Sequence, residues 1–317
     1  MRSPGGVVLA IFAAGAMGIL ASTHLASQEQ KRIVPPLIRP DTAIAVKSDS
    51  IRRALAGVPD SSGSRRDTLG GKSDALDAFE WRTVENRAFG IGEKLVFDVS
   101  YGMVTAGEAI LSIPQAVTID GRQTYAVEVR VNSLPSFSWI YKVEDTYRTF
   151  IDMQSIVPLR FEQHIREGSY RRDFVATFDQ ARNIARTTDG KEVPIPPYVH
   201  DIMSAFYYVR TIDFFGMATG DVIMLQNFYK DKTHDLAVKI LGRQELEVAA
   251  GTFNTIVLEP MVREGGLFKS EGRIVIWLSD DELMIPVRIN SKVVIGSIDV
   301  ELREYSGLLG RPSARIR

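Results

Sequence analysis

The sequence predicts a mainly β protein, in which an antiparallel curved sheet forms a barrel or half-barrel with one covering α-helix at about 201–215. Three observations support this fold class. From about residue 87 onward, most segments alternate apolar and polar residues, which is the period of a strand with one wet face. These segments are short and are separated by turn signals at regular spacing, as in meanders that curl into barrels. Within this part of the chain, only the segment at 201–215 carries apolar residues at helical spacing.

Composition excludes several classes of function. The chain has 317 residues and a formal net charge of -1, so it offers no overall field that would attract nucleic acid. It contains no cysteine, which removes disulfides, thiolate catalysis and cysteine-ligated metals. With only 4 histidines, a histidine-rich metal centre is not expected either. We therefore expect no metal and no cofactor.

Residues 1–26 have the layout of a signal peptide. Arg2 precedes an apolar run from Val7 to Ala21, and small residues follow. The run is shorter than the roughly 20 residues of a comfortable membrane span. Export with cleavage is one interpretation, and an uncleaved N-terminal anchor in the inner membrane is the other.

Residues 27–86 are predicted to be a flexible linker that is mostly disordered. Prolines, an SSGS run and the pair Gly70 and Gly71 interrupt the segment, and no apolar period persists long enough for a core element.

The ordered domain is predicted to span 87–306, beginning with a series of hairpins. Lys94 to Tyr101 places Leu95, Phe97 and Val99 on one face. Asp120-Gly121 suits a two-residue hairpin turn, which joins the strand that ends at Ile119 to the one that begins at Thr124. Further strands are expected at 105–113, 143–151, 157–166 and 170–179. The proline-rich segment 189–198 should then end the meander.

The predicted helix begins at Asp201, a good N-cap residue. Its apolar stripe should cover one face or the open side of the sheet. A second set of strands is expected at 222–229, 234–241, 245–248, 253–260 and 274–302. The apolar parity in the last of these changes at Gly296-Ser297, which predicts a β-bulge and hence curvature. Residues 307–317 lack periodicity and are predicted to be a flexible tail.

Two polar motifs allow both a chemical and a structural interpretation. Asp280-Asp281-Glu282 could supply oxygen ligands to a hard cation, but it lies between two strands and suits a hairpin turn. His200-Asp201 could begin an acid–base or metal pair, but the start of a capped helix explains it without a further partner. No serine lies in a nucleophile-elbow motif. No catalytic residue is predicted.

Aromatic residues are the candidates for ligand binding. A curved sheet with a helix across its mouth could leave a cavity lined by rings, although the same rings could simply fill the core. The candidates are Phe137, Trp139, Tyr141, Phe206, Tyr207 and Trp277.

Four phrases together resemble the DUF3108 family of exported bacterial proteins. They are FGIGEKLVFDVSYGMVTAGEAILSI at 89–113, DIMSAFYYVR at 201–210, AGTFNTIVLEP at 250–260 and GRIVIWLSDDELMIPVRINSKVVIGSIDVEL at 272–302. The resemblance implies an exported, β-rich domain in the envelope of a Gram-negative bacterium, periplasmic or envelope-associated. It implies no catalytic residues.

The function predicted from these observations is that of a non-enzymatic exported envelope protein that binds a hydrophobic or lipid-like ligand in a cupped β domain. The alternative is a structural or assembly factor that binds an envelope protein through a sheet edge. A third, weaker hypothesis is an envelope hydrolase that acts through Glu128, Asp145 or Glu144. Partners are then a lipid or other apolar ligand, or an envelope protein. No nucleic acid is expected, and the protein would be peripheral to the membrane if the signal is cleaved.

Overall fold

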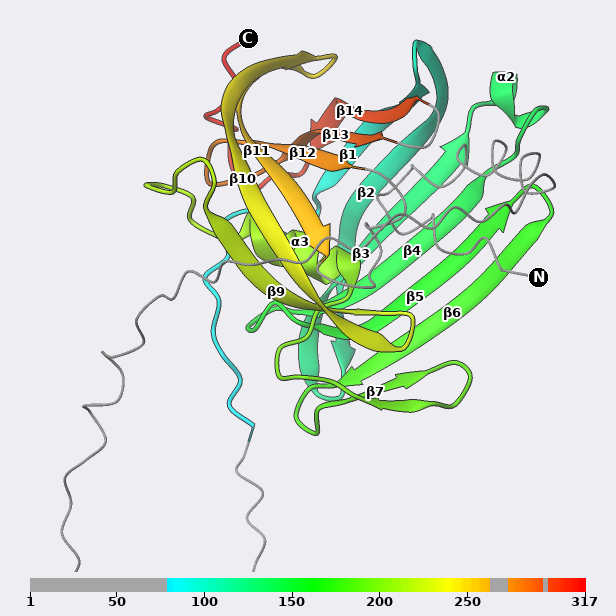
Figure 1. Ribbon diagram of the computed structural model, residues 1–317, viewed down its shortest axis with the longest axis vertical. Coiled ribbons are helices and arrows are strands. Elements are labelled where there is room, and N and C mark those ends of the chain that lie inside the picture. The colour runs from blue at the N-terminus through cyan, green and yellow to red at the C-terminus, as the bar shows by residue number, and fades with distance from the viewer. Residues whose placement is uncertain (1–78, 263–272, 293–295) are drawn as a thin grey trace, which may run out of the picture. The chain divides into compact units, whose positions relative to one another are not determined.

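A computed structural model describes residues 79–262, 273–292 and 296–317 (Figure 1). The predicted signal segment and the linker as far as residue 78 lie outside the described residues. No helix in the described part of the chain is long and apolar enough to cross a membrane.

The protein is built on one antiparallel sheet of 14 strands, which confirms the predicted fold class (Figure 1). The strand order is β8-β7-β6-β5-β4-β3-β2-β1-β14-β13-β12-β11-β10-β9. Strands adjacent in sequence are therefore adjacent in the sheet, except β8 and β9, and the first strand also pairs with the last. β8 and β9 are the two edges, so the sheet curls but does not close.

The first eight strands are β1 (Lys94–Tyr101), β2 (Val104–Ile119), β3 (Arg122–Ser133), β4 (Glu144–Asp152), β5 (Pro158–Glu167), β6 (Tyr170–Asp179), β7 (Ile184–Thr187) and β8 (Glu192–Pro194). The remaining six are β9 (Val222–Tyr229), β10 (Lys232–Val248), β11 (Gly251–Val262), β12 (Ile274–Ser279), β13 (Pro286–Lys292) and β14 (Ser297–Ser306). In the described part of the chain, two helices accompany them, α2 (Pro135–Ser138) and α3 (Ile202–Arg210).

Two long strands each unite segments that the sequence analysis separated. β2 contains the predicted strands 105–113 and 115–119, and its register with β3 shifts between Ser112 and Gln115. β10 contains 234–241 and 245–248, and its register with β11 shifts between Ile240 and Gly242. Gly242 has φ +141°, a conformation that side chains disfavour. Such irregularities bend a strand without ending it, so the sheet gains curvature at these points.

The β-bulge predicted at Gly296-Ser297 is wrong. Lys292 of β13 pairs with Ser297 of β14, so the parity change falls in the connection between two strands and not within one. Gly296 has φ +85° there, as a tight connection often requires. The curvature that the bulge was meant to explain comes instead from the register shifts elsewhere in the sheet.

The helix α3 is shorter than predicted. Asp201 caps its start, because the carboxylate accepts hydrogen bonds from the backbone N–H groups of Met203 and Ser204. It ends at Arg210, where the side chain of Thr211 donates to the carbonyl of Tyr208 at 2.7 Å. Phe214 is nevertheless buried. The apolar residues that follow Arg210 therefore pack in the core although they are not helical. The short helix α2 was not predicted.

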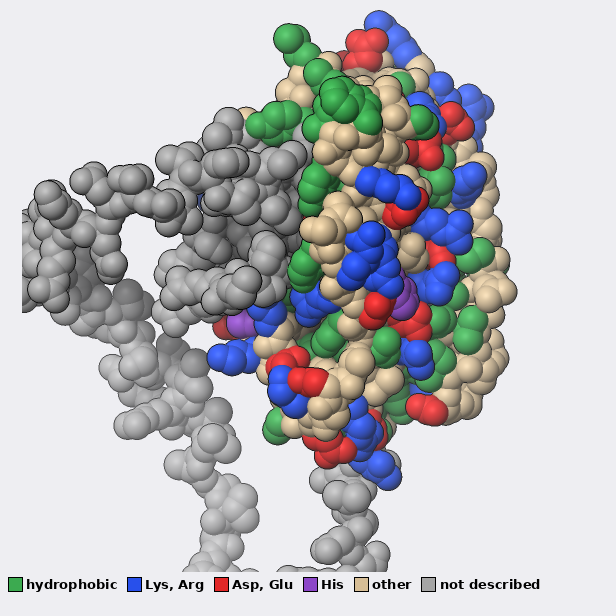
Figure 2. All heavy atoms as spheres, turned by 90° about the vertical axis from the view of Figure 1, so that its right-hand side faces the viewer, with side chains coloured by type: hydrophobic (Ala, Val, Ile, Leu, Met, Phe, Trp, Pro, Cys, Tyr) green, Lys and Arg blue, Asp and Glu red, His purple; other side chains and the backbone are tan. Residues whose placement is uncertain are grey.

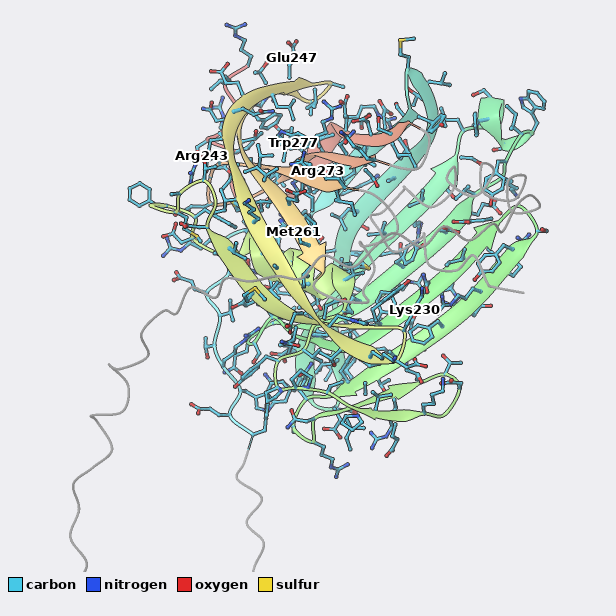
Figure 3. The ribbon with its side chains drawn as sticks, viewed as in Figure 1. Lys230, Arg243, Glu247, Met261, Arg273 and Trp277 are labelled. Carbon is cyan, nitrogen blue, oxygen red and sulfur yellow. The ribbon has the colours of Figure 1, made fainter. Side chains whose placement is uncertain are left out.

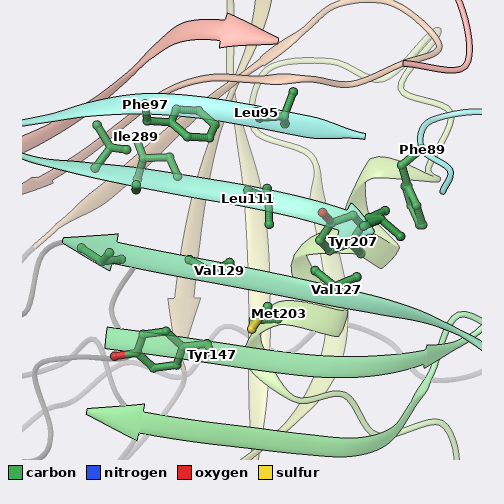
Figure 4. Packing of buried hydrophobic residues seen from close by; sticks show 14 of the residues in the cluster. Phe89, Leu95, Phe97, Leu111, Val127, Val129, Tyr147, Met203, Tyr207 and Ile289 are labelled. Atoms are coloured by element: carbon green, nitrogen blue, oxygen red, sulfur yellow. The ribbon is translucent and has the colours of Figure 1, made fainter. Parts of the chain in front are cut away.

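The core lies between α3 and the concave, inner face of the sheet. Met203 and Tyr207 of α3 pack toward inner-face residues such as Leu111 and Val129 (Figure 4). A buried ion pair holds the helix to the segment before β1, since Arg210 contacts both carboxylate oxygens of Glu93 at 2.7 Å. This arrangement confirms that one helix covers the apolar face of the sheet.

The outer face of β3, β4 and β5 is charged. Glu128, Arg148 and Glu162 are cross-strand neighbours, and Arg148 bonds Glu128 at 2.7 Å. Figure 2 shows acidic and basic side chains intermixed over one side of the domain. Such a face is typical of a solvated surface, so the inner face is the place to look for an apolar site.

Both ends of the predicted domain require correction. The segment 79–86, assigned to the linker, packs on the domain: the Arg122 guanidinium lies 3.6 Å from the Trp81 ring centroid, and Val84 N donates to Gln154 O at 2.8 Å. The predicted flexible tail is also wrong, because Ala314 is buried and its carbonyl accepts from Asn254 N at 2.9 Å. Pairing with β11 fixes this segment despite its lack of periodicity.

Candidate functional site

A contact between β4 and α3 shows which residues of β4 lie on the inner face of the sheet, where a site can form. Thr149 donates a 2.7 Å hydrogen bond to the capping carboxylate Asp201 of α3, so Thr149 points to the helix. Side chains alternate along a strand, hence Tyr147 and Asp145 share that face. At about 3.3 Å per residue, Asp145 lies roughly 13 Å beyond the helix start. The inner face therefore continues well past α3.

The inner face beyond α3 is mainly apolar. Val99, Val131, Val143 and Ile298 come from four strands or their ends and are all buried. Phe137 and Tyr141, from α2 and the connection after it, complete the wall of a small pocket of about 20 Å³. Space of this size accommodates about one water-sized group. The pocket marks the point where the sheet and the α2 segment meet.

Two acidic side chains lie on the same inner face. Glu167 at the end of β5 forms a bridge with Val143, and Asp145 follows two residues later on β4. Asp145 is 4% exposed and accepts a 2.8 Å hydrogen bond from the backbone N–H of Arg166. Glu167 is 1% exposed, and neither of its carboxylate oxygens has a hydrogen-bond partner. A buried carboxyl without partners is unusual in a folded protein.

The pKa values of this carboxyl pair are shifted upward. Burial raises the pKa of Glu167 to about 8, with the nearby charge of Asp145 as a further cause. Burial also raises the pKa of Asp145, although the hydrogen bond from Arg166 opposes the shift. Burial likewise raises the pKa of Tyr141 to about 12. Carboxyls with such shifts inside an apolar wall are candidates for a functional site.

Exposed apolar residues surround the same end of the sheet. Met103 and Val104 lie at the β1–β2 connection, and Trp139 and Ile140 follow α2. Leu134 N bonds Ala106 O at 2.8 Å, and Figure 1 shows the β1–β2 connection and α2 at one end of the sheet. We call Met103, Val104, Trp139 and Ile140 the apolar rim.

The predicted aromatic candidates do not form one cluster. Phe137 and Tyr141 meet at the small pocket, but Trp139 is 81% exposed and does not line it. Phe206 and Tyr207 lie on α3, where the Tyr207 ring packs 4.6 Å from that of Phe89. Their ligand-binding role stays a prediction.

Trp277, the sixth candidate, lies on the outer face. It floors a groove of about 380 Å³ together with Val257 and Val275, and its indole N–H has no partner. Arg273 lies beside it (Figure 3) and bonds Glu259 at 2.6 Å. This groove is separate from the inner-face pocket, because successive residues of β12 point to opposite faces.

A third pocket, of about 880 Å³, has both charged and apolar side chains in its lining. It lies between residues 212–217 and the Asp280–Glu282 turn, and Arg243 spans it by bonding Asp280 at 2.9 Å and Phe214 O at 2.8 Å. Asp281 accepts from Ser279, Leu283 N and Ala314 N, so this acidic motif forms a turn as expected. No cluster of three or more metal-ligating side chains occurs within the described ranges.

The carboxylates proposed for a hydrolase do not converge. Asp145 faces inward, whereas Glu144 precedes it with the opposite orientation, and Glu128 is paired with Arg130 and Arg148 on the outer face. Sequence reasoning missed the carboxyl that does lie near Asp145, that of Glu167. The signal was present: Glu167 and Gln163 share the strand parity of the apolar residues Phe161 and Ile165.

Comparisons with known proteins bear on the family and not on the site. The profile of the family described as "Protein of unknown function (DUF3108)" matches residues 96–303. No curated protein matches the chain significantly.

Several solved bacterial structures match this chain, including the following three. One is a β-barrel-like protein of the domain of unknown function DUF1849 from Brucella abortus, with 8% identity and a TM-score of 0.48, covering 70% of this chain and 98% of that one. Another is a candidate exported protein with a YmcC-like fold from Bacteroides fragilis, with 13% identity and a TM-score of 0.29, covering 71% and 100%. A hypothetical protein, CT021, from Chlamydia trachomatis has 11% identity and a TM-score of 0.31, covering 72% and 92%. The family match over residues 96–303, which is most of the described sheet, is what assigns the chain: it belongs to the DUF3108 family of proteins of unknown function.

Proposed function

We propose that the protein is a non-enzymatic component of the cell envelope that is exported and holds an apolar, lipid-like ligand against the inner face of its sheet. The observation that supports this function is the length of apolar inner face beyond α3. There Val99, Val131 and Ile298 line a wall that the helix does not cover. The export signal expected at residues 1–26 accords with this placement.

Binding requires the α2 segment to move. Sites for small molecules usually occupy about 300 to 1,000 Å³, far more than the pocket of about 20 Å³ at Phe137 and Tyr141. α2 has only 4 residues and buries none of them, so little packing energy holds it in place. Displacement of this short segment would join the pocket to the surrounding inner face. The apolar rim then lies where a lipid-like molecule would enter.

Native mass spectrometry of protein purified from envelope extracts, followed by lipid extraction, tests the proposal. The wild type should carry an apolar ligand. Phe137→Asp should lose it, because a carboxylate at the pocket would have to be desolvated next to the ligand. Ser136→Asp is the matched control on the same segment, since this side chain is exposed and does not line the pocket. Absence of any copurifying lipid, or equal loading of both variants, would contradict the proposal.

A second candidate function, docking of an envelope protein along a sheet edge, is favoured by β9. This edge strand exposes Val222 and Met224, the latter 48% exposed. Only its far part is covered, where His200 N bonds Gln226 O at 2.9 Å and Phe228 N bonds His200 O at 2.7 Å. In-cell crosslinking from position 222 should capture a defined partner, and Met224→Lys should abolish the product. An unchanged crosslinking pattern would count against this function.

A further inference from the structure

The described inner face contains one acidic side chain that lacks any hydrogen-bond partner. Glu167 is 1% exposed, and both of its oxygens are unpaired. A buried carboxylate in this state costs several kcal/mol relative to water unless it is protonated or paired. Asp145 and Tyr141 lie close enough to shift its pKa, but neither makes a hydrogen bond of normal geometry to it, and Glu167 caps no helix and closes no turn through its side chain. No described residue forms a hydrogen bond with it, so the site is open to a partner from outside the described residues.

The groups around Glu167 determine how many hydrogen-bond donors such a partner must bring. Asp145 and Tyr147 face it from β4, Tyr141 lies over the adjacent turn at Gly168, and Arg172 shares the inner face of β6. Asp145 already accepts from Arg166 N, and the hydroxyl of Tyr147 lies 3.5 Å from its second oxygen. The site thus presents acceptors that outnumber the donors which reach them. A suitable partner brings several N–H or O–H donors.

Charge narrows the class of partner further. A carboxylate or phosphate would be repelled by two acidic groups in a medium of low dielectric constant. A calcium ion takes 6 to 8 oxygen ligands and magnesium about 6, more than this pair provides. A protonated primary amine carries one positive charge and three donors on a single nitrogen, which matches two neighbouring carboxylates.

We propose that Asp145 and Glu167 together bind a cationic amine at the head of the ligand, whose apolar part lies along Val99, Val131 and Ile298. The assignment rests on the proposed function, since it names the chemical class of the ligand held at the inner face. Glu167 is the charge-selecting residue, and Asp145 shares the ammonium group. An ammonium binds the ionised pair best, so binding of the amine displaces the proton that the empty pair retains.

The probes are three chains of equal length: dodecylamine, dodecanol and dodecanoate, each below its micelle concentration, titrated by calorimetry. The wild type should bind the amine at least about tenfold more tightly than the alcohol, and dodecanoate least tightly, as expected for one charge-assisted contact. Glu167→Gln should remove most of the preference for the amine and leave the affinity for the alcohol unchanged. Glu162→Gln is the control, because Glu162 lies on the outer face of the same strand and bonds Arg160.

The outcomes separate the two proposals. If the amine and the alcohol bind equally well and Glu167→Gln changes neither, the amine site is overturned while the apolar site stands. If none of the three chains binds, the proposed function itself fails, and the amine site fails with it. Should Glu167→Gln fold poorly, the wild type alone decides: the ratio of amine to alcohol affinity must rise between pH 6 and pH 9, and a constant ratio overturns the proposal.

Discussion

Glu167 makes the stability of the protein depend on pH in a direction opposite to that of most acidic residues. Its pKa is about 8 in the native protein, against an ordinary value of 4.5. Between these values the native state binds the proton and the unfolded state does not, so stability falls as the pH rises through this window. Below about pH 4.5 both states are protonated, and no penalty remains.

Replacement of Glu167 by Gln should therefore stabilise the protein at alkaline pH. Each pKa unit corresponds to about 1.4 kcal/mol, and about 1 kcal/mol shifts the melting temperature of a domain of this size by about 2 to 4 °C. We expect Glu167→Gln to melt about 5 °C or more above the wild type at pH 9 and close to it at pH 5. Differential scanning calorimetry across this range checks the prediction, and parallel curves for the two proteins would contradict it.

His200 makes the stability of the protein depend on pH in the acidic range. Burial lowers its pKa to about 3, and the charge of Arg82 adds to the shift. The unfolded histidine takes up a proton below its ordinary value of 6.5, so stability falls as the pH drops from there toward 3. The histidine that the sequence offered as a possible ligand is instead a neutral, buried contact of Arg82, at 3.3 Å.

At the scale of elements, α3 is held in place by charge as well as by apolar packing. The guanidinium of Arg210 bonds Glu93 and the carbonyls of Ala88, Leu283 and Met284, and both charged side chains are fully buried. One residue thus ties the helix to the segment before β1 and to the turn after β12.

Arg210→Met should destabilise the protein by about 3 to 5 kcal/mol, because it leaves Glu93 buried without a partner. The double variant Arg210→Met with Glu93→Leu should recover a large part of this loss, since two apolar side chains need no compensating charge. Urea unfolding of the wild type, both single variants and the double variant measures the coupling. A double variant as unstable as the sum of its single variants would show that the pair is not coupled.

The elements also show how far the sequence could predict this structure. Strand parity identified nearly every strand, because one face of the sheet is buried and the other is charged. The same parity places Asp145, Gln163 and Glu167 on the buried face. A polar residue at a position where the alternation predicts an apolar one is, however, easily taken for a break in the pattern. The sequence could not tell which aromatic rings meet, since core packing alone is enough to bury rings such as that of Tyr207. Which rings meet depends on contacts between strands that are far apart in the sequence, and the spacing of residues along one strand does not predict such contacts.

At the scale of the whole molecule, the C-terminal segment belongs to the domain. Ala314 N donates to Asp281 at 2.9 Å, and Ile316 N and Asn254 N form further backbone bonds between this segment and β11, both 2.9 Å long. Lack of periodicity concealed this segment in the sequence, because an irregular strand pairs through its backbone and needs no alternation of side chains.

Deletion of residues 311–317 should lower the melting temperature by several degrees, since it exposes the edge of β11 and removes a hydrogen bond to the Asp281 turn. Arg311→Ala, at an exposed position, is the control and should melt like the wild type. Circular dichroism during heating compares the three proteins. A deletion variant that melts like the wild type would restore the interpretation of a free tail.

The pairing of β1 with β14 has a consequence for the order in which the chain can fold. Lys94 pairs with Ser306, so the two strands at the middle of the sheet are among the farthest apart in the described sequence. Each meander, β1 to β8 and β9 to β14, can form from local contacts, but the seam between them closes only when the last strand is available. Contacts of such long sequence separation slow folding. During synthesis or secretion from the N-terminus, one edge of β1 therefore stays unpaired until β14 emerges. At this stage the chain is most prone to aggregate.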